Sequence, residues 1–89
     1  MRLEGNIIGG EFDSELNEFS IQTFKHFETQ STMKQVQVDS LYNYLSKHKD
    51  EEDGQVLTLY DQMPMVLTQD EVNQLLEDLE KVKSYYPAE

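Results

Sequence analysis

The chain has 89 residues and carries 18 acidic side chains against 7 basic ones, a formal net charge of -11 at pH 7. This excess of negative charge argues against direct binding of nucleic acid or of an anionic membrane, and it indicates that a charged partner would be basic. The absence of cysteine excludes disulfides, thiolate metal sites and cysteine nucleophiles. A chain of this length predicts a single domain over residues 1–89.

The N-terminal segment predicts a short strand and a turn. Residues 2–8 favour a short strand. Two adjacent glycines, Gly9 and Gly10, follow it and indicate a turn, because glycine tolerates the dihedral angles that tight turns require. The spacing of apolar residues over 11–20 fits both a helix and a strand, so the structure of this segment stays open.

Two further strands and a helix are expected in the middle of the chain. Phenylalanine, isoleucine and threonine favour a strand over about 17–27, and the polar residues 28–32 favour a turn. Residues 33–38 alternate between polar and apolar side chains, which predicts a strand with one wet face. Residues 39–40 then provide an N-cap for a short helix that ends near His48.

The C-terminal half begins with an acidic loop over 49–54. Residues 56–60 are rich in strand-forming side chains and predict a strand, and a turn over 61–64 leads into another short strand over 65–67. Pro64 belongs at a strand start or at a sheet edge, since proline lacks an amide hydrogen.

A long amphipathic helix is expected over about 69–85. Thr68 and Glu71 form a capping box, in which each side chain accepts the backbone N–H of the other residue. The apolar stripe of this helix recurs at helical spacing and consists of Val72, Leu75, Leu76, Leu79 and Val82. Pro87 ends the helix.

Together these elements predict an α+β fold. We expect a small antiparallel sheet of four or five strands with two helices, of which the C-terminal one packs on the sheet. No stretch approaches the roughly 18 apolar residues of a membrane-spanning helix, and the N-terminus lacks the pattern of a signal peptide. We therefore expect a cytoplasmic protein that does not bind a membrane.

No motif for enzymatic chemistry or cofactor binding is present. The chain lacks the nucleophile pattern G-x-S-x-G and the glycine-rich patterns that bind phosphates. A calcium loop built on Gly54 would place Lys49 and Tyr60 where oxygen ligands are required. The two histidines, His26 and His48, lack companion ligands at a metal-binding spacing. We therefore expect a non-enzymatic protein with no catalytic residue, no cofactor and no metal site.

The negative charge is concentrated in the C-terminal half. Residues 1–49 contain 7 acidic and 5 basic side chains, whereas residues 50–89 contain 11 acidic and 2 basic ones. On a helical wheel, Asp70 and Glu77 lie opposite the leucine stripe, and Asp78 lies on one flank of the polar face. The predicted partner-binding site comprises the acidic residues Glu51, Glu52, Asp53, Asp70, Glu77 and Asp78 and the aromatic anchors Tyr42, Tyr60 and Tyr86.

An array of carboxylates can imitate the phosphates of a nucleic acid. We expect the site to occupy a basic, nucleic-acid-binding surface of a partner protein as an inhibitor, with an attraction that weakens in salt. In composition alone, the chain is similar to small accessory proteins of phages and mobile elements, several of which inhibit host nucleic-acid-binding proteins. Two alternatives stay open: a homo-oligomeric module, such as a homodimer through the edge strand 65–67, and a small-ligand-sequestering protein, with acidity serving only solubility.

Overall fold

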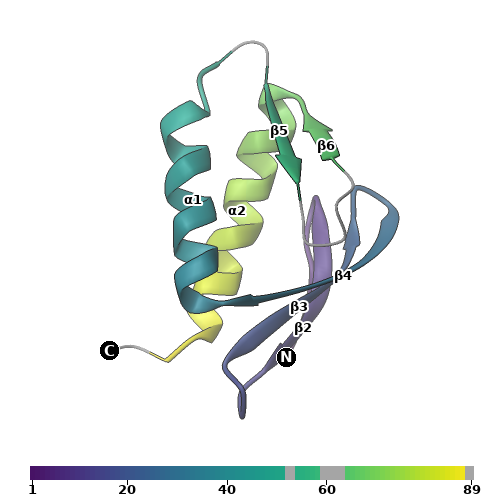
Figure 1. Ribbon diagram of the computed structural model, residues 1–89, viewed down its shortest axis with the longest axis vertical. Coiled ribbons are helices and arrows are strands. Elements are labelled where there is room, and N and C mark those ends of the chain that lie inside the picture. The colour runs from purple at the N-terminus through teal and green to yellow at the C-terminus, as the bar shows by residue number, and fades with distance from the viewer. Residues whose placement is uncertain (52–53, 59–63, 88–89) are drawn as a thin grey trace.

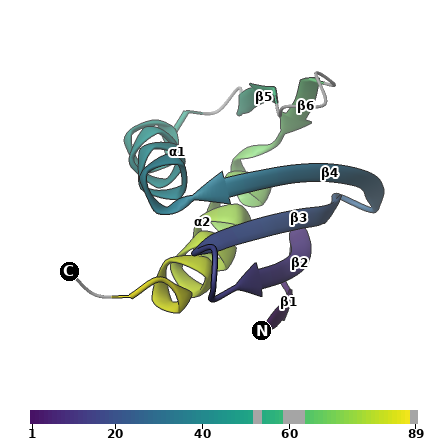
Figure 2. The ribbon, with the colours of Figure 1, turned by 60° about the horizontal axis from the view of Figure 1, so that its bottom comes forward.

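The computed structural model of the chain describes residues 1–51, 54–58 and 64–87 and has the expected α+β fold (Figure 1). Four strands form an antiparallel sheet in chain order, the C-terminal helix packs against one face of this sheet, and the other helix lies beside it (Figure 2). Two further strands pair with each other as a separate sheet. The elements are β1 (Arg2–Glu4), β2 (Ile8–Asp13), β3 (Glu18–Phe24), β4 (Phe27–Lys34), α1 (Gln35–His48), β5 (Gln55–Thr58), β6 (Pro64–Leu67) and α2 (Gln69–Tyr85).

Gly9 and Gly10 lie inside β2, so the prediction of a turn at these residues is wrong. The chain reverses earlier, between β1 and β2, where the backbone N–H of Gly5 donates to the carbonyl of Ile8 at 2.9 Å. Gly10 has no room for a side chain, because a Cβ there would overlap the backbone carbonyl of Ser20 on β3. The pairing of β2 with β3 shifts register between the two glycines, as in a β-bulge.

Residues 11–20, which fitted either a helix or a strand, form the end of β2, a turn and the beginning of β3. The carboxylate of Asp13 accepts the backbone N–H groups of Glu15 and Leu16 at 2.9 and 3.2 Å. Asn17 then adopts a left-handed conformation with a φ of 52°, which asparagine tolerates better than most residues. The turn is therefore held by a local side chain.

The predicted turn over 28–32 is also wrong, because these residues belong to β4. The hairpin between β3 and β4 reverses at Lys25 and His26, whose φ angles are 52° and 77°. Neither is a glycine or an asparagine, so this turn lacks its usual sequence signal. Contacts with distant segments hold it: the Lys25 backbone N–H donates to the carbonyl of Ile7, and the Lys25 Nζ donates to the carbonyl of Val66, each at 2.8 Å.

The first helix, α1, begins at Gln35, so the predicted N-cap at 39–40 is wrong. The predicted strand over 33–38 is correct only for residues 33–34, which end β4, and is wrong for residues 35–38, which are helical. An alternating pattern is compatible with a strand, but in the helical conformation Val38 and Leu45 share one face and are both fully buried. Packing of this face against the rest of the core outweighs the local strand preference of valine.

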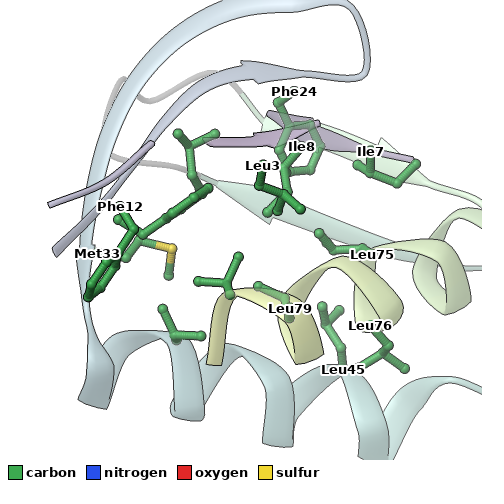
Figure 3. Packing of buried hydrophobic residues seen from close by; sticks show 14 of the residues in the cluster. Leu3, Ile7, Ile8, Phe12, Phe24, Met33, Leu45, Leu75, Leu76 and Leu79 are labelled. Carbon is green, nitrogen blue, oxygen red and sulfur yellow. The ribbon is translucent and has the colours of Figure 1, made fainter. Parts of the chain in front are cut away.

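The prediction of the second helix is confirmed over Gln69–Tyr85. The backbone N–H of Glu71 donates to the hydroxyl of Thr68 at 3.2 Å, and the N–H of Thr68 donates to the Glu71 carboxylate at 2.9 Å. All five residues of the apolar stripe are buried. Figure 3 shows Leu75 and Leu79 beneath the sheet residues, with Leu76 next to Leu45 of α1. The helix therefore joins the sheet and α1 in one core.

The small sheet of β5 and β6 follows α1 in the chain. Its first strand covers the beginning of the segment predicted over 56–60, whose last two residues lie outside the described part of the chain. Pro64 is the first residue of β6, as expected for a residue without an amide hydrogen. Leu67 at the end of β6 is fully buried, and Gly54 lies so close to its carbonyl that a Cβ would overlap it.

Candidate partner-binding surfaces

Asp78 is fully buried, so the prediction that it lies on the exposed acidic face of α2 is wrong. Its Oδ2 accepts the backbone N–H groups of Ile7 and Ile8 at 2.7 and 3.1 Å, and its Oδ1 accepts that of Asn6 at 2.9 Å. These donors replace the water that a carboxylate loses on burial. Gly5 leaves room for the carboxylate, because a Cβ there would overlap it. Asp78 therefore fastens α2 to the turn between β1 and β2.

Tyr86 is a core residue, so the prediction that it anchors a partner is not compatible with its burial. Its hydroxyl donates to the carbonyl of Met33 at 2.6 Å, and its ring meets the Phe12 ring edge-on with 4.9 Å between the centroids. Burial disfavours the phenolate and raises the pKa of Tyr86 to about 12. This tyrosine joins the end of α2 to the sheet.

Tyr42 lies at the seam between the two helices. Its hydroxyl donates to the Glu80 carboxylate at 2.8 Å, and the Lys83 ammonium lies 4.2 Å from the centroid of its ring. The hydrogen bond to Glu80 is the main cause that raises the pKa of Tyr42 above its ordinary value. The ring is partly buried and thus only partly available for an outside contact.

Three of the predicted acidic residues are exposed in the described structure. Asp70 and Glu77 lie on the outer side of α2, where Glu77 also accepts a hydrogen bond from the side chain of Asn6 at 3.3 Å. Glu51 follows α1, and its carboxylate lies 2.6 Å from Nδ1 of His48. Because α1 and α2 run antiparallel, the end of α1 and the beginning of α2 lie at the same end of the molecule (Figure 1). The other predicted residues, Glu52, Asp53 and Tyr60, lie outside the described residues.

The outer face of the four-stranded sheet is a second acidic surface, which sequence analysis missed. The helices lie on the opposite face (Figure 2). We define the acidic sheet face by its acidic side chains: Glu4, Glu11, Asp13, Glu15, Glu18 and Glu28. It is hollowed beside Glu11, Asp13 and Glu15 by an open depression of about 520 Å³. A second depression of about 550 Å³ lies beside Glu28.

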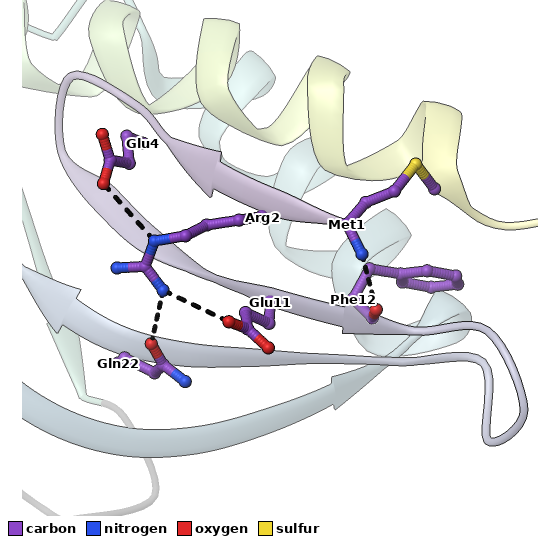
Figure 4. Close-up of polar contacts among 6 residues, drawn as sticks. All are labelled: Met1, Arg2, Glu4, Glu11, Phe12 and Gln22. Carbon is purple, nitrogen blue, oxygen red and sulfur yellow. Dashed lines mark hydrogen bonds and ion pairs between the residues drawn. The ribbon is translucent and has the colours of Figure 1, made fainter.

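Arg2 is at the centre of a polar network on this sheet face (Figure 4). Its guanidinium lies 3.4 Å from the Glu4 carboxylate and 3.6 Å from that of Glu11, and it donates to the side chain of Gln22 at 2.9 Å. The other basic side chain of the face is Lys34, opposite Glu18 in the register of β3 and β4. The acidic sheet face therefore keeps a negative excess of six acidic side chains against two basic ones.

Other basic residues are also engaged with carboxylates inside the chain. In the part of the chain that the structure describes, the Lys25 Nζ lies 3.0 Å from the Glu71 carboxylate, and the Lys83 Nζ lies 3.9 Å from that of Asp39. The hydrogen bond from the Thr68 backbone N–H is the main cause that holds the pKa of Glu71 below its ordinary value, and the hydrogen bond from Lys25 is the next largest. These pairs leave fewer cations to neutralise the exposed carboxylates.

The missed residues carried signals that become readable once the strands are known. Glu11 and Asp13 alternate with the buried Phe12, so both point away from the core when β2 extends through them. On the helical wheel, Glu71 and Asp78 lie on the flank next to the buried Leu75. That flank faces the turns of the sheet, where both carboxylates find hydrogen-bond donors.

The described residues include no group of three or more histidine, aspartate or glutamate side chains placed to hold a metal ion. Among the helices formed by these residues, none is long and apolar enough to cross a membrane. The chain matches no protein-family model, no curated protein and no solved structure.

Proposed function

We propose that this chain is a non-enzymatic, cytoplasmic protein-binding module that occupies a basic, nucleic-acid-binding surface of a partner protein and so inhibits or modulates it. The observation that supports this proposal most is the unneutralised negative charge of the acidic sheet face. Arg2 and Lys34 offset only part of this charge, because the face carries six acidic side chains against these two basic ones, so an incoming cationic surface meets a net excess of carboxylates. Such a field speeds association with a basic partner and disfavours an acidic one.

The strand geometry suits imitation of a phosphate backbone. Glu11 and Asp13 are two residues apart on β2, and residues with this spacing on one face of a strand are separated by about 6.8 Å. This separation is comparable to that of neighbouring phosphates along one nucleic-acid strand. Glu28 on β4 adds a carboxylate across the same face. A lysine- or arginine-lined groove could therefore bind several of these carboxylates at once.

The outer side of α2 is the alternative location of the contact. Asp70 and Glu77 are exposed there, as the sequence predicted, but Lys81 lies on the same side and makes this surface less negative. Asp78 adds nothing to this surface because it is buried. The sheet face therefore offers the larger carboxylate excess, and the two surfaces consist of different residues, so separate substitutions can test them.

Two charge-reversal variants test both the function and its location. One carries Glu15→Lys and Glu28→Lys on the acidic sheet face, and the other carries Asp70→Lys and Glu77→Lys on α2. Each changes the net charge equally, so general electrostatic steering is matched between them. We expect the sheet-face variant to weaken binding to a partner captured from the source lysate by about tenfold or more at low ionic strength, and the helix variant to weaken it much less.

The measurement is titration calorimetry of each variant against the partner, at about 50 mM and about 300 mM NaCl. Circular dichroism before each titration checks that the variants are folded. If both variants bind the partner within about twofold of the unmodified chain at low salt, charge does not direct the interaction and the proposal fails. A larger loss in the helix variant would keep the function and move the contact to α2.

A further inference from the structure

The hairpin of β5 and β6 is separate from the main sheet in the described structure. It is attached to the rest of the fold through the buried Leu67 and through the Lys25 Nζ, which donates to the Val66 carbonyl at 2.8 Å. A two-stranded hairpin is only marginally stable in water, and a third strand adds both hydrogen bonds and buried area. The hairpin is therefore a natural place for strand addition.

An apolar pair is exposed on the outer face of this hairpin. Val56 and Val66 lie directly opposite each other in the strand register and keep 59% and 63% of their surfaces exposed. Pro64, two residues before Val66 on β6, is exposed as well. Alternate residues of a strand share a face, so these side chains form one apolar strip on the side opposite the buried Leu67.

One edge of the hairpin is better placed to accept a strand than the other. On β6, the carbonyl of Val66 already accepts a hydrogen bond from Lys25. On the other side, β5 pairs with β6 and with no other strand among the described residues. An edge strand presents a row of backbone donors and acceptors to an incoming strand. The outer edge of β5 is thus the side on which an added strand would pair.

The acidic residues next to the hairpin in the chain favour an added strand with basic residues. Among the described residues, Asp50 and Glu51 precede the hairpin and Asp70 follows it, and all three are exposed. Two copies of this chain that met hairpin to hairpin would bring these carboxylates together, which is unfavourable. An extended segment with lysine or arginine at its ends would complement the same charge, and apolar side chains in its middle would pack beside Val56 and extend the apolar strip that Val56 forms with Val66.

We propose that the outer edge and apolar strip of the β5–β6 hairpin bind an extended segment of the partner protein that is flanked by basic residues and has apolar side chains at alternate positions. This inference rests on the proposed function, since it takes the partner to be basic. The hairpin would add a contact through strand pairing and apolar packing to the electrostatic contact of the acidic sheet face. Main-chain hydrogen bonds along β5 provide part of the affinity, and the strip at Val56 and Val66 provides specificity for a segment with apolar side chains.

A synthetic peptide tests this contact without knowledge of the partner. The probe has alternating valine and threonine residues between pairs of lysines, and its control has serine in place of every valine. Amide NMR spectra of the full chain report where each peptide binds. We expect the valine peptide to shift the amides of residues 55–58 and to bind more tightly than the serine peptide by about fivefold or more.

The matched variants are the double substitution Val56→Thr with Val66→Thr and the single substitution Val36→Thr. All three valines are exposed, and threonine keeps the branched shape that suits strands, so the hairpin should stay folded. Val36 lies on α1, away from the hairpin in the chain. The double variant is expected to lose most of the preference for valine over serine, and the Val36→Thr variant to keep it.

Three outcomes would overturn the inference. Equal binding of both peptides, with shifts spread over the carboxylates, would mean that charge alone attracts the peptide, and the proposed function would stand. Absence of binding by either peptide would remove the hairpin as a docking site, while the charge-reversal variants would still decide the proposed function. Sedimentation that reveals self-association, abolished by the double threonine variant, would assign the apolar strip to a second copy of this chain.

Discussion

Ile7 and Asp78 lie 71 positions apart in the chain and are joined by a buried hydrogen bond of 2.7 Å from the Ile7 backbone N–H to the Asp78 carboxylate. The same carboxylate accepts the N–H groups of Asn6 and Ile8, so one side chain of α2 organises the whole turn between β1 and β2. Because Asp78 is fully buried, its carboxylate is not one of the exposed acidic side chains that a partner could contact.

Replacing Asp78 by asparagine is expected to destabilise the fold. The amide nitrogen of asparagine is a donor and would face one of the three backbone donors, which would leave a buried N–H without an acceptor. The expected loss is about 2–3 kcal/mol in the free energy of unfolding, measured by urea denaturation. Glu77→Gln is the matched control, because Glu77 is exposed and should cost less than about 0.5 kcal/mol. Equal stability of the two variants would contradict the role of Asp78.

The hydroxyl of Tyr86 gives a second prediction. Tyr86→Phe removes its hydrogen bond to the Met33 carbonyl and should cost about 1 kcal/mol. Since the pKa of Tyr86 rises from 10.0 to about 12 on folding, its contribution to stability is fully present below pH 10 and disappears as the pH approaches 12. Denaturation of both proteins across this interval should show their stabilities converging. A constant difference between them would contradict the burial of this group.

The N-terminus of α1 gives a stabilising prediction. The side chain of Gln37 accepts the backbone N–H of Lys34 at 2.8 Å, which is one half of a capping box. A lysine side chain has no acceptor for the other half, so Lys34→Thr should complete the box. We expect a gain of about 0.5–1 kcal/mol, observed as a higher thermal midpoint. Lys34→Ala serves as the control, since it also removes the charge but supplies no acceptor, and a gain of equal size there would refute the capping argument.

Glu71 gives a prediction on the acid side. Its pKa lies below the ordinary value of 4.5 because the Thr68 N–H and the Lys25 ammonium favour the carboxylate. A lowered pKa contributes stability that is present above the unfolded value and is lost as the pH falls through the folded one. The difference in unfolding free energy between the unmodified chain and Glu71→Gln should therefore shrink from neutral pH to about pH 3. A difference that does not change with pH would contradict the lowered pKa of Glu71 in the folded chain.

Some elements were predictable because their signals are local. Thr68 and Glu71 are three residues apart, and the apolar stripe that follows them recurs at helical spacing, so sequence alone placed α2 correctly. The polar segment 28–32 looks like a turn by composition, yet pairing with β3 makes it a strand. The true turn at Lys25 and His26 is held by Ile7 and Val66, which are distant in the chain and leave no local trace.

The residues of the candidate site also fall into those whose position followed from local sequence and those whose position depends on distant contacts. Asp70 and Glu77 were placed on the surface because the helix that carries them was predicted correctly. Asp78 was misplaced because its three hydrogen-bond donors come from the other end of the chain, and no periodicity in α2 reveals them. The acidic sheet face was missed because Gly9 and Gly10 were interpreted as a turn, which hid the alternation of β2.

The most direct test of the proposed function is affinity capture from the source lysate with the tagged chain, in which bound proteins are eluted in steps of rising salt and identified by mass spectrometry. The sheet-face variant with Glu15→Lys and Glu28→Lys is the parallel bait. We expect one basic nucleic-acid-binding protein that elutes with salt, is depleted from the variant bait, and is displaced from its nucleic acid by the unmodified chain. Recovery of the same proteins by both baits would exclude the acidic sheet face as the contact, and a captured protein whose nucleic-acid binding is unaffected would contradict the proposed function.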